Sequence, residues 1–438
     1  MIAVEPTRPN IALEPAAPSF AERRGSARTL DGSQGFHDSM AKALFLSLPL
    51  RGHINPSLPL VRELVGRGDE IVYYSADAFV ADIEQAGARY QPYRNACLTD
   101  LSQLFARTDE LSWLLMRTSA RVLETELEVF RAERPDYVIT DSVAPWGQWA
   151  GEILGVPVVT SVSTFAFNRR VLAFGLAHGV RPKSARLLLS KMRHMAKAFL
   201  LGRRLRHVYG VRGPGVMGSV LGRSDLNIVY TSRYFQPCAE TFDERFQFVG
   251  PSMTSRTETA NFPWDQVRLP VVVYVSLGTL FNTDITFYQN CFEAFAGQDF
   301  QVIMSTGANV SRESLGVAPP NFIVESHVPQ LEVLQRVSVF VTHGGMNSVS
   351  ESLYYGVPVV VIPQMGEQAI VGRKVEELGA GLYLAKEAAT AEKLRESVQQ
   401  LLAEDGFRRQ AAAVRESFQD AGGAARAADA ILAFTRRA

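Results

Sequence analysis

A strand–loop–helix–strand pattern that occurs twice constrains the fold of this 438-residue chain more than any other feature. The first copy starts at Ala43 and reads "ALFLSLPL", the loop "RGHI", the helix "NPSLPLVRELVGRG" and the strand "EIVYYS". Asn55 would cap this helix, with Pro56 in its first turn. The second copy follows Pro270, beginning with "VVVYVSLG" and ending with "FQVIMST". Such units build parallel sheets, so we predict an α/β fold with two doubly wound domains and a ligand cleft between them.

Changes in composition along the chain indicate the domain boundaries. Residues 1–39 are rich in Pro, Ala, Ser and Gly and lack the apolar segment of a secretion signal, so we expect a disordered leader. We expect the first domain at 40–252 and the second at 253–420, joined through the polar stretch "PSMTSRTETANFPWDQ". A final helix is expected at 421–438, after the break at "AGG".

The charge balance and the cysteines argue against several classes of protein. Lys plus Arg and Asp plus Glu both number 45, which gives no reason to expect a nucleic-acid partner. Cys97, Cys238 and Cys291 are too few and too scattered for a disulfide framework or a cysteine metal site, and they fit a reducing cytoplasm. No apolar run reaches the roughly 18 residues that a membrane helix needs.

The segment 181–212 is strongly basic. The sequence has no Asp or Glu from Ile153 to Ser224, and "ARLLLSKMRHMAKAFLLGRRLRHV" sets Arg and Lys among apolar residues. This pattern is typical of a basic amphipathic helix. Such a helix could lie peripherally on an anionic membrane, could roof an apolar ligand pocket, or could simply be a solvated surface helix.

The segment "FVTHGGMNSVSESLYYG", from Phe340, predicts a strand that ends at His343, a glycine turn and a short helix. Unpaired amides and the helix dipole make the start of such a helix suitable for phosphate. His343, Asn347 and Ser348 add side-chain donors, and Glu351 could accept from a ribose diol. Alternatively, Ser348 and Glu351 could form a capping box, and the glycines could merely shape the turn.

His53 and Asp141 are candidates for general-base chemistry. His53 lies after the first strand and Asp141 ends the strand "PDYVITD", and the carboxyl ends of parallel strands meet at one edge of a sheet. A neutral imidazole can take a proton near neutral pH, and a carboxylate on its other nitrogen would fix the tautomer. Alternatively, His53 could be inert and Asp141 could cap the helix around "APWGQWAGEIL".

The run "HVPQLEVLQRVSVFVTHGGMNSVSESLYYGVPVVVIPQMGEQ" resembles the donor-binding signature of UDP-sugar-dependent glycosyltransferases, most closely bacterial macrolide-type members. The resemblance extends from about Ala41 to the C terminus and includes "RGHINPSLPLVREL" and "FQFVGPS". It implies the GT-B fold, in which two Rossmann-like domains face each other across a cleft. The N-terminal domain would bind the acceptor, the C-terminal domain the nucleotide-sugar, and the last helix would cross back.

The same resemblance implies roles for matching residues. Val328 would pair with uracil through its backbone, and Gln330 would lie close by. Glu351 would bind the ribose. Glu367 and Gln368 would bind the hydroxyls of the donor sugar. The residues implied for the diphosphate are Ser276, Gly278, Thr279, His343, Gly345, Asn347 and Ser348. The family uses a His–Asp pair at the positions of His53 and Asp141. Plant relatives carry Trp at the positions of His327 and Met346. Since this chain lacks both, we expect weaker stacking on uracil, and a different nucleotide-sugar donor remains an alternative.

The implied activity is an inverting, metal-independent transfer of a sugar, foremost glucose from UDP-glucose, to a hydroxyl of a hydrophobic acceptor. Polyketides, macrolides and flavonoids are the acceptor classes expected. No prosthetic group is expected, because the nucleotide-sugar is a co-substrate. One alternative is a membrane-associated glycosyltransferase acting on a lipid or terpenoid. Another is a non-catalytic nucleotide-sugar-binding protein, against which the presence of both His53 and Asp141 argues. We expect a cytoplasmic protein, with peripheral membrane contact as an option.

Overall fold

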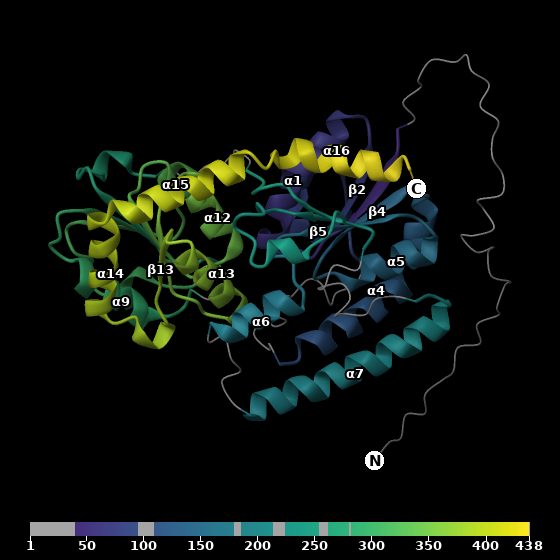
Figure 1. The fold of residues 1–438 in the computed structure, drawn as a ribbon, viewed down its shortest axis with the longest axis horizontal. Coiled ribbons are helices and arrows are strands. Elements are labelled where there is room, and N and C mark those ends of the chain that lie inside the picture. Colours follow the sequence, from purple (N-terminus) through teal and green to yellow (C-terminus); the bar gives the residue numbers. More distant parts are fainter. Residues whose placement is uncertain are drawn as a thin grey trace. The chain divides into compact units, whose positions relative to one another are not determined.

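The computed structural model describes residues 40–94, 109–178, 185–212, 224–253, 262–279 and 282–437 (Figure 1). The predicted leader, the middle of the predicted linker and the first four residues of the basic segment lie outside these described residues.

The first domain is built on a sheet that has seven strands within the described residues, in the order β3-β2-β1-β4-β5-β6-β7. All neighbouring strands are parallel. Apart from the polar, partly exposed edge strand β3, the strands are mostly apolar and buried, as expected for a parallel sheet covered by helices on both faces. Their bounds are Lys42–Leu46 (β1), Glu70–Ser75 (β2), Arg89–Pro92 (β3), Tyr137–Asp141 (β4), Val158–Val162 (β5), Leu226–Val229 (β6) and Phe246–Phe248 (β7).

The helices of the first domain follow the strands as crossover connections. The helix α4 packs against both α5 and α7. The helices are Arg51–Gly66 (α1), Val80–Gln85 (α2), Leu111–Glu133 (α4), Pro145–Leu154 (α5), Arg169–Ala177 (α6) and Ala185–Tyr209 (α7), and the 3-10 turns are Asp77–Phe79 (η2) and Ala239–Thr241 (η4). Within the described residues, no helix is both long and apolar enough to cross a membrane.

The second domain repeats the design with a sheet of six parallel strands, counted over the same described residues, in the order β10-β9-β8-β11-β12-β13. The strands are Val272–Ser276 (β8), Gln301–Ser305 (β9), Phe322–Glu325 (β10), Val339–Thr342 (β11), Val359–Val361 (β12) and Gly381–Tyr383 (β13). The helices are Ile285–Phe295 (α9), Arg312–Leu315 (α10), Gln330–Leu334 (α11), Met346–Tyr354 (α12), Gly366–Glu377 (α13), Ala391–Ala403 (α14), Asp405–Gln419 (α15) and Gly423–Thr435 (α16), with 3-10 turns Trp264–Gln266 (η5) and Lys386–Ala388 (η6). The predicted α/β class with two doubly wound sheets is confirmed.

Each sheet has one topological switch point, where chain order runs outward in both directions. In the first sheet this point lies between β1 and β4, and in the second between β8 and β11. Open α/β sheets bind ligands in the crevice outside the strand ends at such points. The last helix, α16, packs on α1 and β6 of the first domain through Ala427, Ala428 and Ile431, and Figure 1 shows it in yellow beside α1.

The start of α1 differs from the sequence-based expectation. The helix begins at Arg51, not at Asn55, so His53 lies within its first turn and not in a preceding loop. The backbone amides of His53 and Ile54 both donate to the carbonyl oxygen of Leu50, at 2.9 and 3.0 Å. Pro56 therefore sits inside the helix, where it cannot donate a hydrogen bond to the carbonyl of Gly52.

Candidate active site

His53 meets two residues at the switch point of the first sheet. Its Nδ1 lies 2.8 Å from Oδ2 of Asp141, the last residue of β4, and 3.0 Å from Oγ of Ser163, which follows β5. Because β1, β4 and β5 are adjacent parallel strands, their carboxyl ends bring α1, Asp141 and Ser163 together. The expected hydrogen bond between His53 and Asp141 is thus present.

The carboxylate of Asp141 does not cap a helix. Its Oδ1 accepts a hydrogen bond from the amide of Val143 at 2.7 Å, while α5 starts at Pro145 with Ala144 in the N-cap position. The helix-cap alternative for Asp141 is therefore wrong. An ionised carboxylate only accepts hydrogen bonds, so the Nδ1 of His53 must carry the proton. This leaves the lone pair of Nε2 available to accept a proton from a substrate.

The electrostatic surroundings of His53 increase its basicity. Burial opposes charging of the imidazole and lowers its pKa, whereas the negative charge and the hydrogen bond of Asp141 raise it. The carboxylate of Glu367 in the second domain raises the pKa further. The net result is a His53 pKa above the ordinary value of 6.5. The imidazolium that forms on proton uptake is therefore stabilised.

His343 occupies the corresponding edge of the second sheet, directly after β11. Its ring lies against two glycines: a Cβ at Gly278 would come within 2.6 Å of the ring carbon Cε1, and one at Gly345 within 2.4 Å of Nε2. Gly344 has φ +84°, and a Cβ there would meet Val361 at 2.5 Å. Gly344 and Gly345 thus allow the loop between β11 and α12 to fold closely around the ring of His343, which packs against Gly278 after β8.

The imidazole of His343 is held neutral. Burial lowers its pKa to about 4, although a hydrogen bond with the backbone of Ser276 opposes the change. At neutral pH His343 can therefore contribute a hydrogen bond but no positive charge. A contact between His343 and a diphosphate would therefore be a neutral hydrogen bond and not an ion pair.

The start of α12 is open to a ligand. Gly345 occupies the N-cap position and provides no side-chain hydrogen bond, and the half-buried Asn347 and Ser348 lie in the first turn. Ser348 is inside the helix, and Oε2 of Glu351 instead accepts from Nε2 of Gln330 at 2.6 Å. The capping-box alternative is therefore wrong. The amides of this first turn are the kind that bind anions.

Residues implied for the nucleoside lie around Glu351, which is 4% exposed. The hydroxyl of Tyr274 donates to Oε1 of Gln330 at 3.2 Å, so Gln330 links Tyr274 to Glu351. Val328 is half-buried just before α11 and packs against the core of the second domain.

A narrow pocket beside Glu351 is lined from both domains. Ser252 and Ser350 contribute hydroxyl oxygens that are buried and have no partner in the described structure. The other lining residues are Pro56, Tyr230, Pro251, Met253, Asn347 and Glu351.

The remaining predicted donor residues differ in their surroundings. Oγ of Ser276 accepts from the amide of Gly278 at 3.2 Å, and Thr279 is exposed. Oε1 of Glu367 accepts from Oγ1 of Thr164 in the first domain at 2.5 Å. The side-chain oxygen of Gln368 accepts from the amides of residues 364 and 365, so it closes the turn before α13.

Comparisons with known proteins agree with this geometry. The family model of the erythromycin biosynthesis protein CIII-like C-terminal domain matches residues 289–425. The NDP-glycosyltransferase YjiC of Bacillus subtilis (strain 168) is 36% identical over 92% of this chain and 98% of its own. This chain belongs to the UDP-glycosyltransferase family. It is thus a glycosyltransferase.

Two further similarities support this assignment. The demethyllactenocin mycarosyltransferase of Streptomyces fradiae is 31% identical over 90% of this glycosyltransferase and 86% of its own chain. The crystal structure of CalG4, the calicheamicin glycosyltransferase, superposes with a TM-score of 0.74 at 29% identity, covering 91% of this chain and 99% of that one. The expected GT-B fold is thereby confirmed.

Three features of the glycosyltransferase site escaped the sequence-based prediction. Ser163 and Thr164 follow the strand of "PVVTSVST", and the rule that strand ends converge could have identified them. The third is a hydrogen bond from Nδ2 of Asn347 to the carbonyl oxygen of Gly52 at 3.0 Å. The carbonyl of Gly52 could not be recognised as a free acceptor without knowing that α1 begins before Pro56, because Pro56 has no amide hydrogen to bond it.

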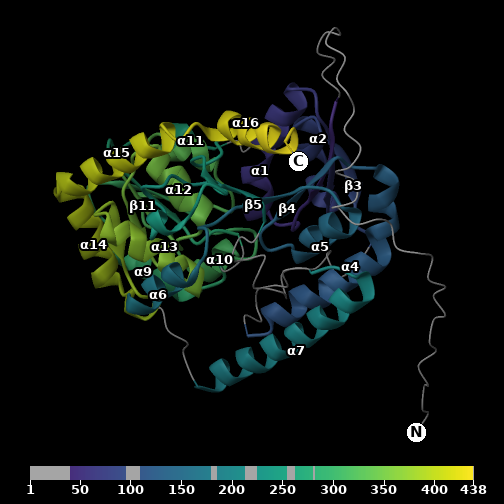
Figure 2. The same ribbon diagram turned by 45° about the vertical axis from the view of Figure 1, so that its right-hand side comes forward.

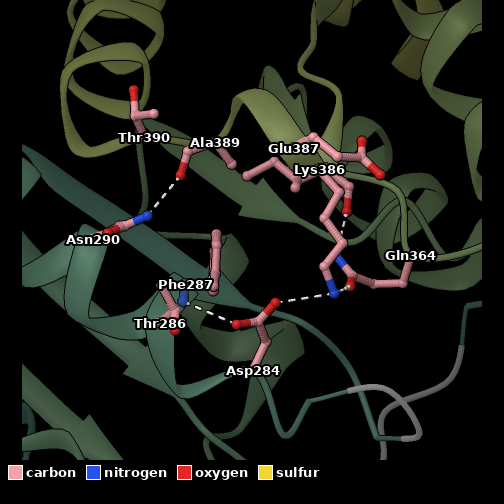
Figure 3. Close-up of a pocket in the computed structure, with 10 residues that line it drawn as sticks. Asp284, Thr286, Phe287, Asn290, Gln364, Lys386, Glu387, Ala389 and Thr390 are labelled. Atoms are coloured by element: carbon pink, nitrogen blue, oxygen red, sulfur yellow. Dashed lines mark hydrogen bonds and ion pairs between the residues drawn. The ribbon is translucent and has the colours of Figure 1, made fainter.

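A larger pocket of about 190 Å³ lies in the second domain of the glycosyltransferase (Figure 3). Lys386 crosses it, bonding Asp284 at 2.9 Å and the side-chain oxygen of Gln364 at 2.7 Å. No predicted site residue lines this pocket. Its lining residue Gln364 nevertheless donates its backbone amide to Gln368, so the pocket lies next to that predicted donor residue.

Proposed function

We propose that this glycosyltransferase transfers a sugar, foremost glucose from UDP-glucose, to a hydroxyl group of a hydrophobic small molecule such as a polyketide, macrolide or flavonoid. The observation that carries the proposal is the His53–Asp141 pair, held opposite Glu367 and the start of α12. The names of the similar mycarosyl- and calicheamicin glycosyltransferases support an acceptor of the natural-product type.

The proposed reaction is a single in-line displacement. Nε2 of His53 takes the proton of the acceptor hydroxyl, whose oxygen attacks the anomeric carbon. The bond from that carbon to the diphosphate breaks, the nucleoside diphosphate leaves with the electron pair, and the configuration inverts. Asp141 stabilises the imidazolium formed on His53.

The donor would be held by the second domain. First-turn amides of α12, the side chains of Asn347 and Ser348, and the neutral His343 would donate hydrogen bonds to the diphosphate. Glu351 would accept from the ribose, and Glu367 from the sugar hydroxyls. Since these groups supply the diphosphate contacts, we expect transfer to continue unchanged when EDTA is added.

Product detection tests this proposal. The purified chain is incubated with UDP- and TDP-sugars against a panel of phenols and macrolides, and products are identified by mass spectrometry. We expect a glycoside with UDP-glucose, and nuclear magnetic resonance should give the anomeric configuration opposite to that of the donor. Retention of the anomeric configuration would exclude the single displacement. A preference for TDP-sugars would exclude UDP-glucose as the preferred donor.

A second candidate is a glycosyltransferase that works at a membrane surface on a lipid or terpenoid acceptor. The observation that favours it is the outer face of α7, where exposed Leu, Met and Phe side chains alternate with Arg and Lys. Glycosylation of a lipid in vesicles, with no product from soluble phenols, would favour this candidate over the first.

A further inference from the structure

The helix α7 exposes an apolar face. Figures 1 and 2 show it running along α4 at the edge of the first domain. Ala198, Gly202 and Leu205 face inward and are buried, and Ser190 bonds Asp109 on the same side. On the opposite side the exposed apolar residues are Leu188, Leu189, Met192, Met195, Phe199 and Leu200.

These apolar residues form one surface. Leu188, Met192, Met195 and Phe199 follow one another at spacings of four, three and four residues, so they lie in one row along the helix. Leu189 and Leu200 are 69% and 63% exposed and lie in the adjacent row. Contiguous exposed apolar surface of this kind in a folded protein usually marks an interaction site.

A row of cations flanks this apolar face. Arg186, Arg193, Lys197 and Arg204 are spaced by seven, four and seven residues, which sets them along one side of the helix. All four are exposed. The sequence has no acidic residue between 153 and 224, so α7 itself carries no carboxylate to neutralise them.

We propose that this outer face of α7 is a docking surface for an anionic phospholipid bilayer. A bilayer offers acyl chains to the apolar rows and lipid phosphates to the cations along the whole helix, which is about 37 Å long. A second copy of the chain fits less well, because pairing through this face would bring two rows of like charge together. The proposal is independent of the first candidate function, and it deepens the second candidate, which uses the same face of α7.

Sedimentation of the full-length chain with vesicles tests the charge requirement. We expect binding to vesicles of equal parts phosphatidylcholine and phosphatidylglycerol, weakening as salt is raised, and little binding to phosphatidylcholine alone. Removing two charges with Arg193→Gln and Lys197→Gln should lower the partition coefficient roughly thirtyfold. The matched control, Arg408→Gln with Arg409→Gln on α15, removes the same charge elsewhere and should bind as the wild type does.

Insertion of the apolar face is tested by fluorescence. Tryptophan at Phe199 should shift its emission to shorter wavelength and be quenched by brominated acyl chains in the mixed vesicles, whereas tryptophan at the exposed Val317 should not.

Three results would overturn the proposal. One is equal binding to the two vesicle types. Another is no binding to either type. The third is a solution dimer that Leu189→Ser with Leu200→Ser dissociates, which would assign this face to a second copy.

Discussion

Nδ2 of Asn347 donates a hydrogen bond to the carbonyl oxygen of Gly52, 3.0 Å away, and so joins the start of α12 to the turn that carries His53. The oxygen is available because Pro56, four residues on, has no amide hydrogen to offer it. The candidate diphosphate site and the candidate base are thus connected by one bond between the two domains. A bound diphosphate would compete with Gly52 for the Asn347 amide.

Replacing Asn347 by Ala should lower the affinity for UDP about tenfold, since a hydrogen bond to a charged phosphate is lost. Titration calorimetry with UDP measures the effect. Asn290→Ala is the matched control, because Nδ2 of Asn290 also donates to a carbonyl, that of Ala389, at 3.0 Å. Both variants should lose about 1 kcal/mol of unfolding free energy. Equal UDP affinity in the two variants would remove Asn347 from the donor site.

His343 should make the fold sensitive to acid. Its pKa is about 4 in the folded chain and near 6.5 when unfolded, so between these values the unfolded chain binds more protons. The free energy of unfolding should therefore fall by about 3 kcal/mol as the pH drops from 6.5 to 4 through this residue alone. Urea unfolding at several pH values, compared with His343→Gln, isolates the contribution. Identical pH dependence in the two proteins would show that His343 does not titrate in this way.

The pH dependence of kcat/KM should report His53. A protonated imidazole cannot accept the acceptor's proton, so kcat/KM should fall as the pH drops below the raised pKa of His53. Asp141→Asn removes the charge that raises this pKa, so the acidic limb should move to lower pH while kcat falls by roughly 10² to 10⁴. Ser163→Ala removes the other hydrogen-bond partner of Nδ1, 3.0 Å away, and should lower kcat by less than Asp141→Asn does. If the acidic limb of the kcat/KM profile stayed at the same pH in Asp141→Asn, the limb would not report the ionisation of His53.

Gly345→Ala tests the packing around the His343 ring. The added methyl group would come within 2.4 Å of Nε2 of His343, so the ring or the α12 start must shift. We expect a loss of about 1 to 3 kcal/mol in unfolding free energy and weaker UDP binding. Gly66→Ala at the end of α1 meets nothing within 4 Å and should be neutral or stabilising. Unchanged UDP affinity in Gly345→Ala would contradict the role assigned to this turn.

The sequence predicted what depends on strand periodicity. Buried parallel strands are continuous apolar runs, so both sheets could be recognised. Because parallel strands end at one edge, the juxtaposition of His53 with Asp141 could also be predicted from the order of the strands.

Two local interpretations of the sequence were wrong. Pro56 reads as the first turn of a helix, yet α1 extends back to Arg51 because Leu50 accepts from two amides. The sequence pattern of Glu351 indicates a capping box, yet the carboxylate of Glu351 accepts a hydrogen bond from Gln330 of another helix. The partner of Glu351 lies in another helix, so a local pattern could not identify it. The hydrogen bonds that start α1 are local, but Asn55 and Pro56 carry the usual signals of a helix start and so indicated a later one.

The central claim is that His53 removes the proton of the acceptor while the second domain holds the nucleotide. The most direct test is to compare His53→Ala with the wild type in two measurements, the rate of glycoside formation and the dissociation constant for UDP. We predict that transfer falls by roughly 10² to 10⁴ while UDP affinity stays within about twofold. Transfer at the wild-type rate, or a loss of UDP binding that matches the loss of rate, would contradict the claim.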